Sequence, residues 1–300
     1  MIALLAPGQG SQTPGMLTDW LGLPGAAERI ERWSQISGLD LAALGTTATA
    51  EEITDTAITQ PLVVATTLLA FDELARRGLP AETGVAGHSV GEIAAYAIAG
   101  VIGSDDAVKL AAVRGSEMAK ACAAEPTGMS AVLGGDEAEV LARLEALELV
   151  AANRNAAGQI VAAGAMSALE KLAEDPPAKA RVRQLATAGA FHTHYMASAA
   201  EGYAAAAGQV RASDPTTTLL SNVDGQPVTS AADAMEKLVA QLTRPVRWDL
   251  CNQTIGKLNT GAIVEFPPAG TLTGIAKREL RGVSTHAVKT PADLDGLTEL

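Results

Sequence analysis

The chain has 300 residues, enough for two average domains or for one large α/β domain that carries an insertion. Hydrophobic residues make up 48% of it and aromatic residues only 3%, so the core has to be built mainly from Ala, Val, Leu and Ile. The formal net charge of −12 argues against a nucleic-acid binder, because phosphate contacts require clustered cations. An anionic partner would have to use a local basic patch.

The sequence gives no sign of a membrane segment or a metal site. No apolar run approaches the roughly 20 residues that cross a bilayer, and segment 2–6 lacks the basic leader and the length of a signal peptide. Cys122 and Cys251 lie far apart in the sequence and are expected to be small buried hydrophobic residues. Neither the cysteines nor the histidines have metal-ligand spacing. We therefore expect a soluble, cytoplasmic protein without a bound metal.

The first part of the chain predicts alternating strands and helices. The expected elements, in chain order, are a strand at 2–6, a Gly- and Pro-rich loop at 7–14, polar helices and loops to about residue 59, an amphipathic helix at 60–77, a strand at 83–86, a helix at 92–99, and a helix capped by Ser104. Such alternation predicts a parallel sheet.

The order of the expected strands and helices changes between about residues 121 and 189. The expected elements are a strand at 129–133, a helix at 136–147, strands at 149–153 and 159–163, a helix at 166–173 and a strand at 181–185. This βαββαβ order is the split pattern of a ferredoxin-like module. We therefore predict an α/β fold: a hydrolase-like parallel-sheet large subdomain, 1–120 and 190–300, with an inserted ferredoxin-like small subdomain, 121–189. The large subdomain is expected to close with a strand at 262–266 and a helix at 271–280.

Residues 87–91, Gly-His-Ser-Val-Gly, have the form G-x-S-x-G between an expected strand and an expected helix. The flanking glycines suit a cramped turn that exposes the hydroxyl of Ser89, and the backbone N–H of Val90 could then stabilise an oxyanion. In a chain this rich in Gly and Ala, the pattern alone is equally compatible with a simple tight turn. Other residues are needed to distinguish a nucleophile from a simple turn.

A nucleophilic serine needs a base, and the candidates are His88, His192, His194 and His286. The His88 side chain leaves the turn in a different direction from Ser89, so we expect it to shape the elbow. His192 is the stronger candidate, because it lies where the chain re-enters the large subdomain and can overhang the elbow. A surface histidine or an N-cap neighbour is the alternative. His194 is expected to be a loop residue.

Gln9 follows the first strand and would sit at the carboxyl edge of the sheet. It could be an oxyanion-hole donor beside Val90, where one donor is worth about 3 kcal/mol of transition-state stabilisation. The rival interpretation of this loop is a nucleotide site. It fails because Thr13 replaces the third glycine of G-x-G-x-x-G and no Gly-Lys-Ser/Thr follows.

Arg114 lies on the helix that starts near Ser104. Its planar guanidinium group could bind a substrate carboxylate through two hydrogen bonds. Alternatively, Arg114 could be a solvent-facing member of an ion pair. The sequence spacing does not decide between the two. The neighbouring Gly115 lowers the stability of the helix, which indicates that another segment of the chain or a ligand packs closely against the helix at this position.

Taken together, these motifs resemble those of the malonyl-CoA:acyl-carrier-protein transacylases of fatty-acid and polyketide synthesis, from Met1 to about Leu280. The matching segments are 8–12, 60–61, 87–91, 114–115 with Met118, 129–134, 153–155 with 158–159, and 191–193. One departure concerns a turn before the last helix, where Pro267-Pro268-Ala269 stands in place of the family's common Gly-Pro-Gly.

The resemblance implies a role for each site residue. Ser89 would accept the acyl group with His192 as its base, and a backbone carbonyl, here that of Gln241, would orient the histidine. Gln9 and Val90 would form the oxyanion hole, and Arg114 would bind the malonyl carboxylate. The remaining substrate-binding residues would be Met118, Phe191 and Asn153. Related polyketide acyltransferases that choose malonyl carry Ala-Phe-His, as at 190–192, and those that choose methylmalonyl carry Ala-Ser-His. Such a pocket discriminates one methyl group by only about 1–3 kcal/mol.

The implied activity is a ping-pong transfer of malonyl from malonyl-CoA, through a malonyl-serine, to the phosphopantetheine thiol of an acyl carrier protein. No bound cofactor, nucleic acid or membrane is implied, and a monomer is expected. A serine esterase or thioesterase, with an acidic partner for the histidine, remains an alternative, as does a non-catalytic carrier-protein scaffold. The carrier is acidic, so two basic groups are candidate docking faces, although either alone is more typical of a solvated charge run: Lys179, Arg181 and Arg183, or Lys277, Arg278 and Arg281.

Overall fold

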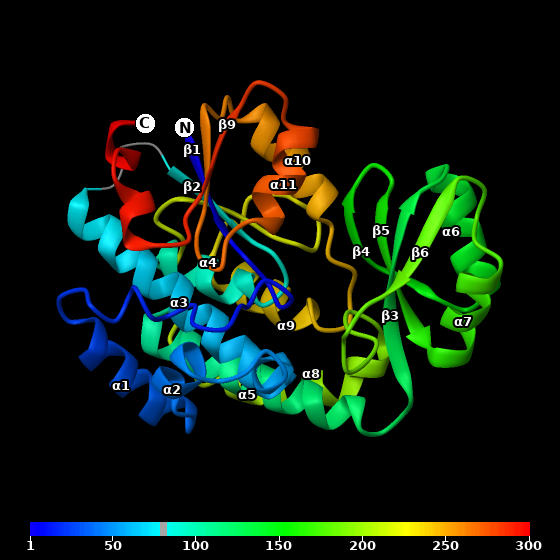
Figure 1. The fold of residues 1–300 in the computed structure, drawn as a ribbon, viewed down its shortest axis with the longest axis horizontal. Helices are drawn as coiled ribbons and strands as arrows, with labels where there is room; N and C mark the ends of the chain where they lie inside the picture. The colour runs from blue at the N-terminus through cyan, green and yellow to red at the C-terminus, as the bar shows by residue number, and fades with distance from the viewer. Residues whose placement is uncertain (79–82) are drawn as a thin grey trace.

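The computed structural model describes residues 1–78 and 83–300, and it places two sheets side by side (Figure 1). The larger sheet is parallel throughout, and its strands, from edge to edge, are β7 (Thr218–Leu220), β2 (Thr83–Gly87), β1 (Ile2–Ala6), β8 (Ala262–Glu265) and β9 (Ser284–Ala287). The α/β class predicted from the sequence is therefore confirmed.

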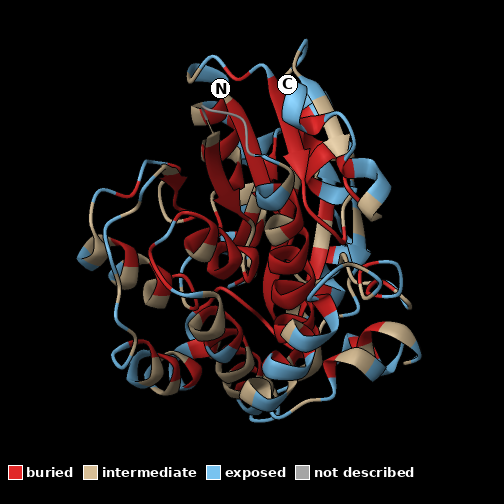
Figure 2. Ribbon diagram, turned by 90° about the vertical axis from the view of Figure 1, so that its left-hand side faces the viewer, coloured by how far each residue is buried: buried red, intermediate tan, exposed pale blue. Residues whose placement is uncertain are grey.

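Both faces of the parallel sheet are covered, and Figure 2 shows its strands and the adjoining helices as buried. In β1, Ile2, Leu4 and Ala6 face one core, while Ala3 and Leu5 face the other. The first core includes residues of α1 (Ala26–Ser37), α2 (Leu41–Thr46), α3 (Thr56–Arg77), α4 (Gly91–Ile98), α5 (Ser104–Cys122), α8 (Ala197–Ala207) and α9 (Ala231–Ala240). The second includes residues of α10 (Trp248–Lys257) and α11 (Thr271–Glu279). A strand buried on both faces is typical of a parallel sheet.

The small sheet is antiparallel and has the strand order β4-β5-β3-β6. Its elements are β3 (Thr127–Gly134), α6 (Glu137–Ala146), β4 (Val150–Ala156), β5 (Gln159–Ala165), α7 (Met166–Glu174) and β6 (Ala180–Gln184). Side chains of α6 and α7 pack with those of the strands in a separate core. The predicted ferredoxin-like βαββαβ unit is thus present, while its predicted limits, 121 and 189, stay predictions.

Helix α3 corrects the expectation that no apolar run is long enough to cross a bilayer. It has 22 residues, and its most apolar stretch of 18 residues has a mean hydropathy of 1.2, which suffices by length and composition, but 78% of that stretch is buried inside the protein. It begins at Thr56 rather than Gln60, because Asp55 caps it by accepting from the Ala57 N–H. The N-terminal turn of α3 is also what approaches Gly115, where a Cβ would lie 2.7 Å from the Thr56 carbonyl oxygen.

Three smaller expectations are wrong. The large subdomain does not close at α11, because β9 adds a further parallel strand, and β7 is a second strand that the sequence pattern did not indicate. These strands have only 3 and 4 residues, too few for a clear periodicity. Ser104 is the first residue of α5 rather than its cap, which is Gly103; the Ser104 hydroxyl accepts from Arg29 at 3.4 Å.

The remaining short elements are the 3-10 helices η1 (Glu52–Thr54), η2 (His194–Met196), η3 (Pro291–Leu294) and η4 (Leu297–Glu299). The departure from the family pattern lies between β8 and α11, where the Pro267-Pro268 peptide bond is cis. The Thr67 hydroxyl donates to the Pro267 carbonyl at 2.9 Å, which ties this turn to α3. The buried Glu265 carboxylate accepts the N–H groups of Leu272 and Thr273 and so caps α11.

Candidate active site

Ser89 lies on a strained turn between β2 and α4. Its φ is 54°, in the left-handed region that residues other than glycine rarely adopt. A Cβ on Gly87 would lie 2.1 Å from the Gly91 carbonyl oxygen, and a Cβ on Gly91 would lie 2.3 Å from the Ala6 carbonyl oxygen. Neither position can therefore carry a side chain. Such a turn is typical of a nucleophile elbow.

The hydroxyl of Ser89 contacts His192, whose Nε2 lies 2.7 Å from the Ser89 Oγ. The other ring nitrogen, Nδ1, lies 2.8 Å from the main-chain oxygen of Gln241. A carbonyl only accepts, so Nδ1 carries the proton and Nε2 is left to accept from the serine hydroxyl. Burial, with the nearby Arg114 guanidinium, lowers the pKa of His192 to about 3. The imidazole is therefore neutral at pH 7, as a general base must be.

Two backbone N–H groups beside the elbow are available to an oxyanion. Within residues 1–78 and 83–300, the N–H groups of Gln9 and Val90 donate to no other group of the protein. The Gln9 side chain has another task, because its Nε2 donates to the Thr56 hydroxyl at 3.2 Å. The main-chain N–H of Gln9, and not its side chain, is therefore the group free for the predicted oxyanion-hole role.

Arg114 is a buried cation beside the nucleophile, with 1% of its surface exposed. Its guanidinium donates to two neutral amide oxygens at 2.8 Å, those of Gln60 and Gln241, and one of its nitrogens lies 3.3 Å from the Ser89 Oγ. Burial lowers the pKa of Arg114 to about 10, so it stays protonated at pH 7. The solvent-facing ion pair, one alternative from the sequence, is wrong. A buried guanidinium held by neutral groups is suited to receive an anion.

These groups line one cavity of about 280 Å³ between the two sheets. Of the residues singled out from the sequence, the cavity wall contains Gln9, Ser89, Arg114, Met118, Asn153, Phe191 and His192. The side chain of Val90 is buried beneath the elbow, and Gln241 lies behind His192 and Arg114. The structure thus brings the predicted catalytic and substrate-binding residues together.

The other histidines lie as expected or away from the nucleophile. His88 Nε2 is 2.9 Å from the Asn155 Oδ1, and its ring meets Trp248 edge to face, so it supports the elbow. His194 is exposed and stacks on Tyr195. His286 belongs to the edge strand β9.

Sequence reasoning missed the polar residues that support the elbow from behind. The Asn222 Oδ1 accepts the Ser89 N–H at 2.8 Å, and its Nδ2 donates to the Gly87 carbonyl at 2.6 Å. Glu92 is fully buried and accepts from both Asn222 and Gln241. A single Asn after a three-residue strand gives no pattern, whereas the acidic residue next to the G-x-S-x-G motif was a signal that could have been used.

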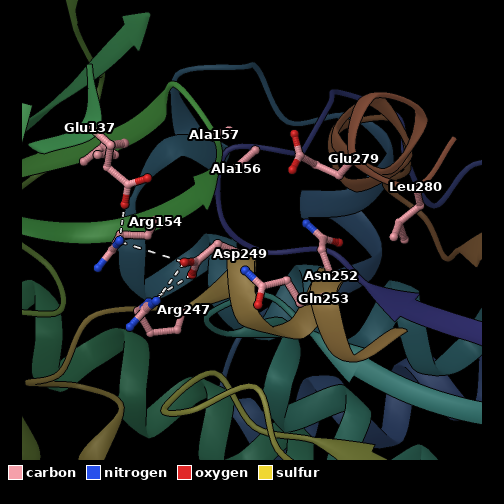
Figure 3. Close-up of a pocket in the computed structure, with 11 residues that line it drawn as sticks. Glu137, Arg154, Ala156, Ala157, Arg247, Asp249, Asn252, Gln253, Glu279 and Leu280 are labelled. Carbon is pink, nitrogen blue, oxygen red and sulfur yellow. Dashed lines mark hydrogen bonds and ion pairs between the residues drawn. The ribbon is translucent and has the colours of Figure 1, made fainter. Parts of the chain in front are cut away.

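A second cavity of about 280 Å³ lies between β4 and helices α10 and α11 (Figure 3). Four of its charged side chains pair with one another: Arg154 with Glu137 and Asp249, and Arg247 with Asp249 at 2.8 Å. Glu279 also lines the cavity. Among the described residues that line it there is no Ser, Thr, Cys or His, so it offers no nucleophile. In the described part of the chain, no cluster of three or more His, Cys, Asp or Glu is placed to hold a metal ion.

A serine whose proton passes to a neutral imidazole attacks acyl carbon atoms and becomes acylated itself. The fold and the site thus define an α/β protein whose Ser89 and His192 are arranged as a nucleophile and base for acyl chemistry. A simple tight turn at residues 87–91 does not account for the contacts of Ser89 with His192 and Arg114.

Comparison with known proteins narrows this class. Residues 4–292 match the family model described as the acyl transferase domain. The malonyl CoA-acyl carrier protein transacylase of Mycolicibacterium smegmatis is 78% identical over 290 residues, which cover 95% of this chain and 100% of that protein. The crystal structure of MCAT from Mycobacterium tuberculosis has a TM-score of 0.98 and 72% identity, with 99% of both chains covered. A malonyl-transacylase in complex with a type II PKS acyl-carrier protein has a TM-score of 0.94 and 30% identity.

The chain therefore belongs to the acyl transferase domain family and is an acyltransferase.

Proposed function

We propose that the chain transfers the malonyl group from malonyl-CoA to the phosphopantetheine thiol of an acyl carrier protein. The observation that carries this is the position of Arg114, a buried cation 3.3 Å from the Ser89 Oγ with only neutral hydrogen-bond partners. A cation so close to the nucleophile favours a short acyl group with a distal carboxylate. The malonyl transacylases that are 72% and 78% identical to the chain support the same substrate.

The first half-reaction would acylate the enzyme. The His192 Nε2 takes the proton of Ser89 while Oγ bonds to the thioester carbon, and the N–H groups of Gln9 and Val90 stabilise the oxyanion. The carbon–sulfur bond then breaks, and the imidazolium returns its proton to the leaving sulfur of coenzyme A. In the meantime the Gln241 carbonyl stabilises the N–H side of the imidazolium.

The second half-reaction would run the same steps in the opposite direction. His192 takes the proton of the carrier's thiol, the sulfur bonds to the malonyl carbon, and the ester bond to Ser89 breaks. The proton returns to the serine oxygen, which restores the free enzyme. Two half-reactions that share one covalent intermediate give ping-pong kinetics.

The hydrolase alternative is less well supported. It predicts an Asp or Glu partner for the base, and His192 instead meets the main-chain oxygen of Gln241. A non-catalytic scaffold would not require the strained turn or the contact between Ser89 and His192. The cytoplasmic location, the monomeric state and the lack of a bound cofactor stay predictions.

Intact-mass measurement after mixing with malonyl-CoA tests the proposal. We expect a stable malonyl adduct on the wild type, loss of that adduct in Ser89→Ala, and transfer of the adduct to added holo carrier protein. Release of free malonate without an adduct would favour the hydrolase. Unchanged carrier loading by Ser89→Ala would rule out the covalent route.

A further inference from the structure

Glu92 is a buried carboxylate that the mechanism above does not use. It lies in the first turn of α4, and none of its surface is exposed. Its Oε1 accepts the Asn222 N–H at 2.7 Å, and its Oε2 accepts from the side-chain amide of Gln241. Both donors are neutral, and within residues 1–78 and 83–300 Glu92 forms no ion pair. Burial of a carboxylate without a cation in contact lowers the stability of the fold, so a purely structural role does not explain a glutamate at this position.

Gln241 connects Glu92 to the reacting groups. Its Nε2 donates to Glu92 and to the Ser89 carbonyl at 3.1 Å, while its Oε1 accepts from Arg114 at 2.8 Å. Its main-chain oxygen accepts from His192. One residue therefore contacts the nucleophile's backbone, the base and the buried cation.

The direction of the Gln241 amide decides whether Arg114 has an acceptor. An amide has an acceptor at one end and donors at the other, so a reversed Gln241 would point its NH₂ group at the guanidinium, a donor facing a donor. An ionised carboxylate can only accept, so Glu92 in its ionised form requires the NH₂ end on its own side. The second acceptor of Arg114, Gln60, is held more weakly, because its own NH₂ group meets the sulfur of Met118 at 3.4 Å.

We propose that Glu92 is a positioning residue for substrate selection: it fixes the direction of the Gln241 amide, which fixes the Arg114 guanidinium, and so it sets the preference for acyl groups with a distal carboxylate. This inference rests on the proposed function, in which Arg114 binds the malonyl carboxylate. It concerns selectivity, because the main-chain contact of Gln241 with His192 does not depend on the direction of the side-chain amide.

Glu92→Gln tests the inference with almost no change in shape. The new amide cannot accept from both Asn222 and Gln241 through separate oxygens, so one buried donor loses its acceptor or the Gln241 amide reverses. We expect the ratio of kcat/KM for malonyl-CoA over acetyl-CoA to fall about 10- to 100-fold, mainly through a higher KM for malonyl-CoA. Glu92→Asp keeps an acceptor-only group and should retain more of this preference than Glu92→Gln.

Two further variants separate positioning from folding. Glu73→Gln is a matched control, because Glu73 is also buried, accepts from Arg76 and Arg77, and does not line the active-site cavity; the malonyl preference should not change. Gln241→Met removes the amide but keeps the main-chain carbonyl, so it should lower the malonyl preference by itself. Adding Glu92→Gln to Gln241→Met should then cause little further loss, because both act through the same amide.

Three results would overturn the inference. The first is an unchanged malonyl preference in folded Glu92→Gln, and the second is an equal loss of malonyl and acetyl transfer. The third is a fully additive loss in the double variant. Arg114→Ala distinguishes these from a failure of the proposed function: if Arg114→Ala keeps the malonyl preference, the role of Arg114 itself is wrong.

Discussion

The Nδ1 of His192 lies 2.8 Å from the main-chain oxygen of Gln241, so the base is oriented by a backbone carbonyl and not by a carboxylate. The carbonyl fixes the tautomer as an aspartate would, but it adds no negative charge beside the ring. The pKa of His192 therefore stays low, at about 3, because burial and the Arg114 guanidinium both favour the neutral form. This has a direct consequence for the pH dependence of acylation.

We expect acylation of Ser89 by acetyl-CoA to keep its rate as the pH falls from 7 to 5. A histidine with its usual pKa would be protonated below about pH 6.5 and lost as a base. His192, with a pKa of about 3, stays neutral over this whole interval. Single-turnover rates, measured by quenching and mass spectrometry, check this, and an acid limb near pH 6.5 would contradict it.

Malonyl-CoA should behave differently from acetyl-CoA over the same interval. Burial raises the pKa of Glu92 to about 7, so below pH 7 the carboxyl becomes protonated and can donate to Gln241 instead of accepting from it. The preference for malonyl-CoA over acetyl-CoA should therefore decline as the pH falls through 7, and Glu92→Gln should remove this dependence.

The other titratable groups around Glu92 do not titrate near pH 7, so a change in substrate preference near this pH can be assigned to Glu92. Arg114 faces it from α5 with a pKa of about 10, and Tyr203 from α8 has a raised pKa because it is buried. Burial also raises the pKa values of Tyr96 and Cys251 well above their usual ranges. An equal loss of rate with both substrates as the pH falls through 7 would contradict the assignment.

Arg114→Ala should strongly lower malonyl transfer and keep or improve acetyl transfer. The substitution removes the one cation placed beside the Ser89 Oγ in the described cavity, while the Ser89 and His192 contact stays. A lost charge-assisted hydrogen bond is worth about 2 kcal/mol or more, which is a loss of at least about 30-fold for malonyl-CoA. Steady-state kinetics with both substrates measure the effect. Equal losses on the two substrates would count against the role in carboxylate binding.

Gly91→Ala should destabilise the fold rather than alter selectivity. The added Cβ would lie 2.3 Å from the Ala6 carbonyl and 2.5 Å from that of Pro7, both rigid backbone atoms. We expect a loss of about 3 kcal/mol in the free energy of unfolding, at the upper end for overpacking. Gly10→Ala is a control without a clash, because nothing lies within 4 Å of its Cβ position, although its φ of 99° adds some strain. Urea unfolding compares the two, and an unchanged midpoint in Gly91→Ala would contradict the clash.

Sequence periodicity predicted most of the long elements up to residue 185, but it did not predict helices α8, α9 and α10, and it was insufficient for the short strands. The ferredoxin-like unit was predictable because its strands and helices are long enough to show periods of 2 and 3.6 residues. Strands β7 and β9, with 3 and 4 residues, are too short for that. Ser104 was mistaken for a cap because Ser is a favoured N-cap residue, whereas Gly103 holds that place through backbone conformation alone.

The site was predictable where its chemistry belongs to a side chain within a motif. Ser89 and His192 carry such signals. Gln241 acts on His192 through a main-chain oxygen, which any residue has, so only the family resemblance pointed to it. The side-chain task of Gln241, between Glu92 and Arg114, depends on three elements that meet only in the folded chain.

Phe191→Ser should relax the discrimination against a methyl branch. Phe191 is 6% exposed and lines the cavity together with Ser89 and Arg114. The smaller side chain leaves room for an α-methyl group, and a pocket discriminates one methyl by about 1–3 kcal/mol, so the methylmalonyl-to-malonyl ratio should rise about 10-fold. Competition between the two CoA esters, read by mass spectrometry of the acyl-enzyme, measures the ratio. An unchanged ratio would mean that the methyl group points elsewhere.

The family resemblance implies an acidic carrier, which we therefore expect to dock at the exposed basic group at the end of α11, which comprises Lys277, Arg278 and Arg281. Helix α11 begins at the cavity, which Thr271 and Ile275 line, and Arg278 donates at 2.7 Å to Gln159, another residue of the cavity wall. The second basic group, Lys179, Arg181 and Arg183, lies on or beside β6, an edge strand of the small sheet. Arg183 pairs through its backbone with Ala131 of the cavity wall, but among the described residues no side chain of this group donates a hydrogen bond to that wall.

Charge reversal separates the two faces. Lys277→Glu with Arg278→Glu and Arg281→Glu should raise the KM for the carrier about 10-fold at low salt, with a smaller difference at high salt, because exposed charges are screened. The malonyl-CoA half-reaction, measured as adduct formation, should not change. Lys179→Glu with Arg181→Glu and Arg183→Glu is the matched control, with the same number of reversed charges, and should leave the KM for the carrier near the wild-type value. The opposite pattern would place the carrier on the small subdomain, where its pantetheine arm would enter the same cavity from the side of β6.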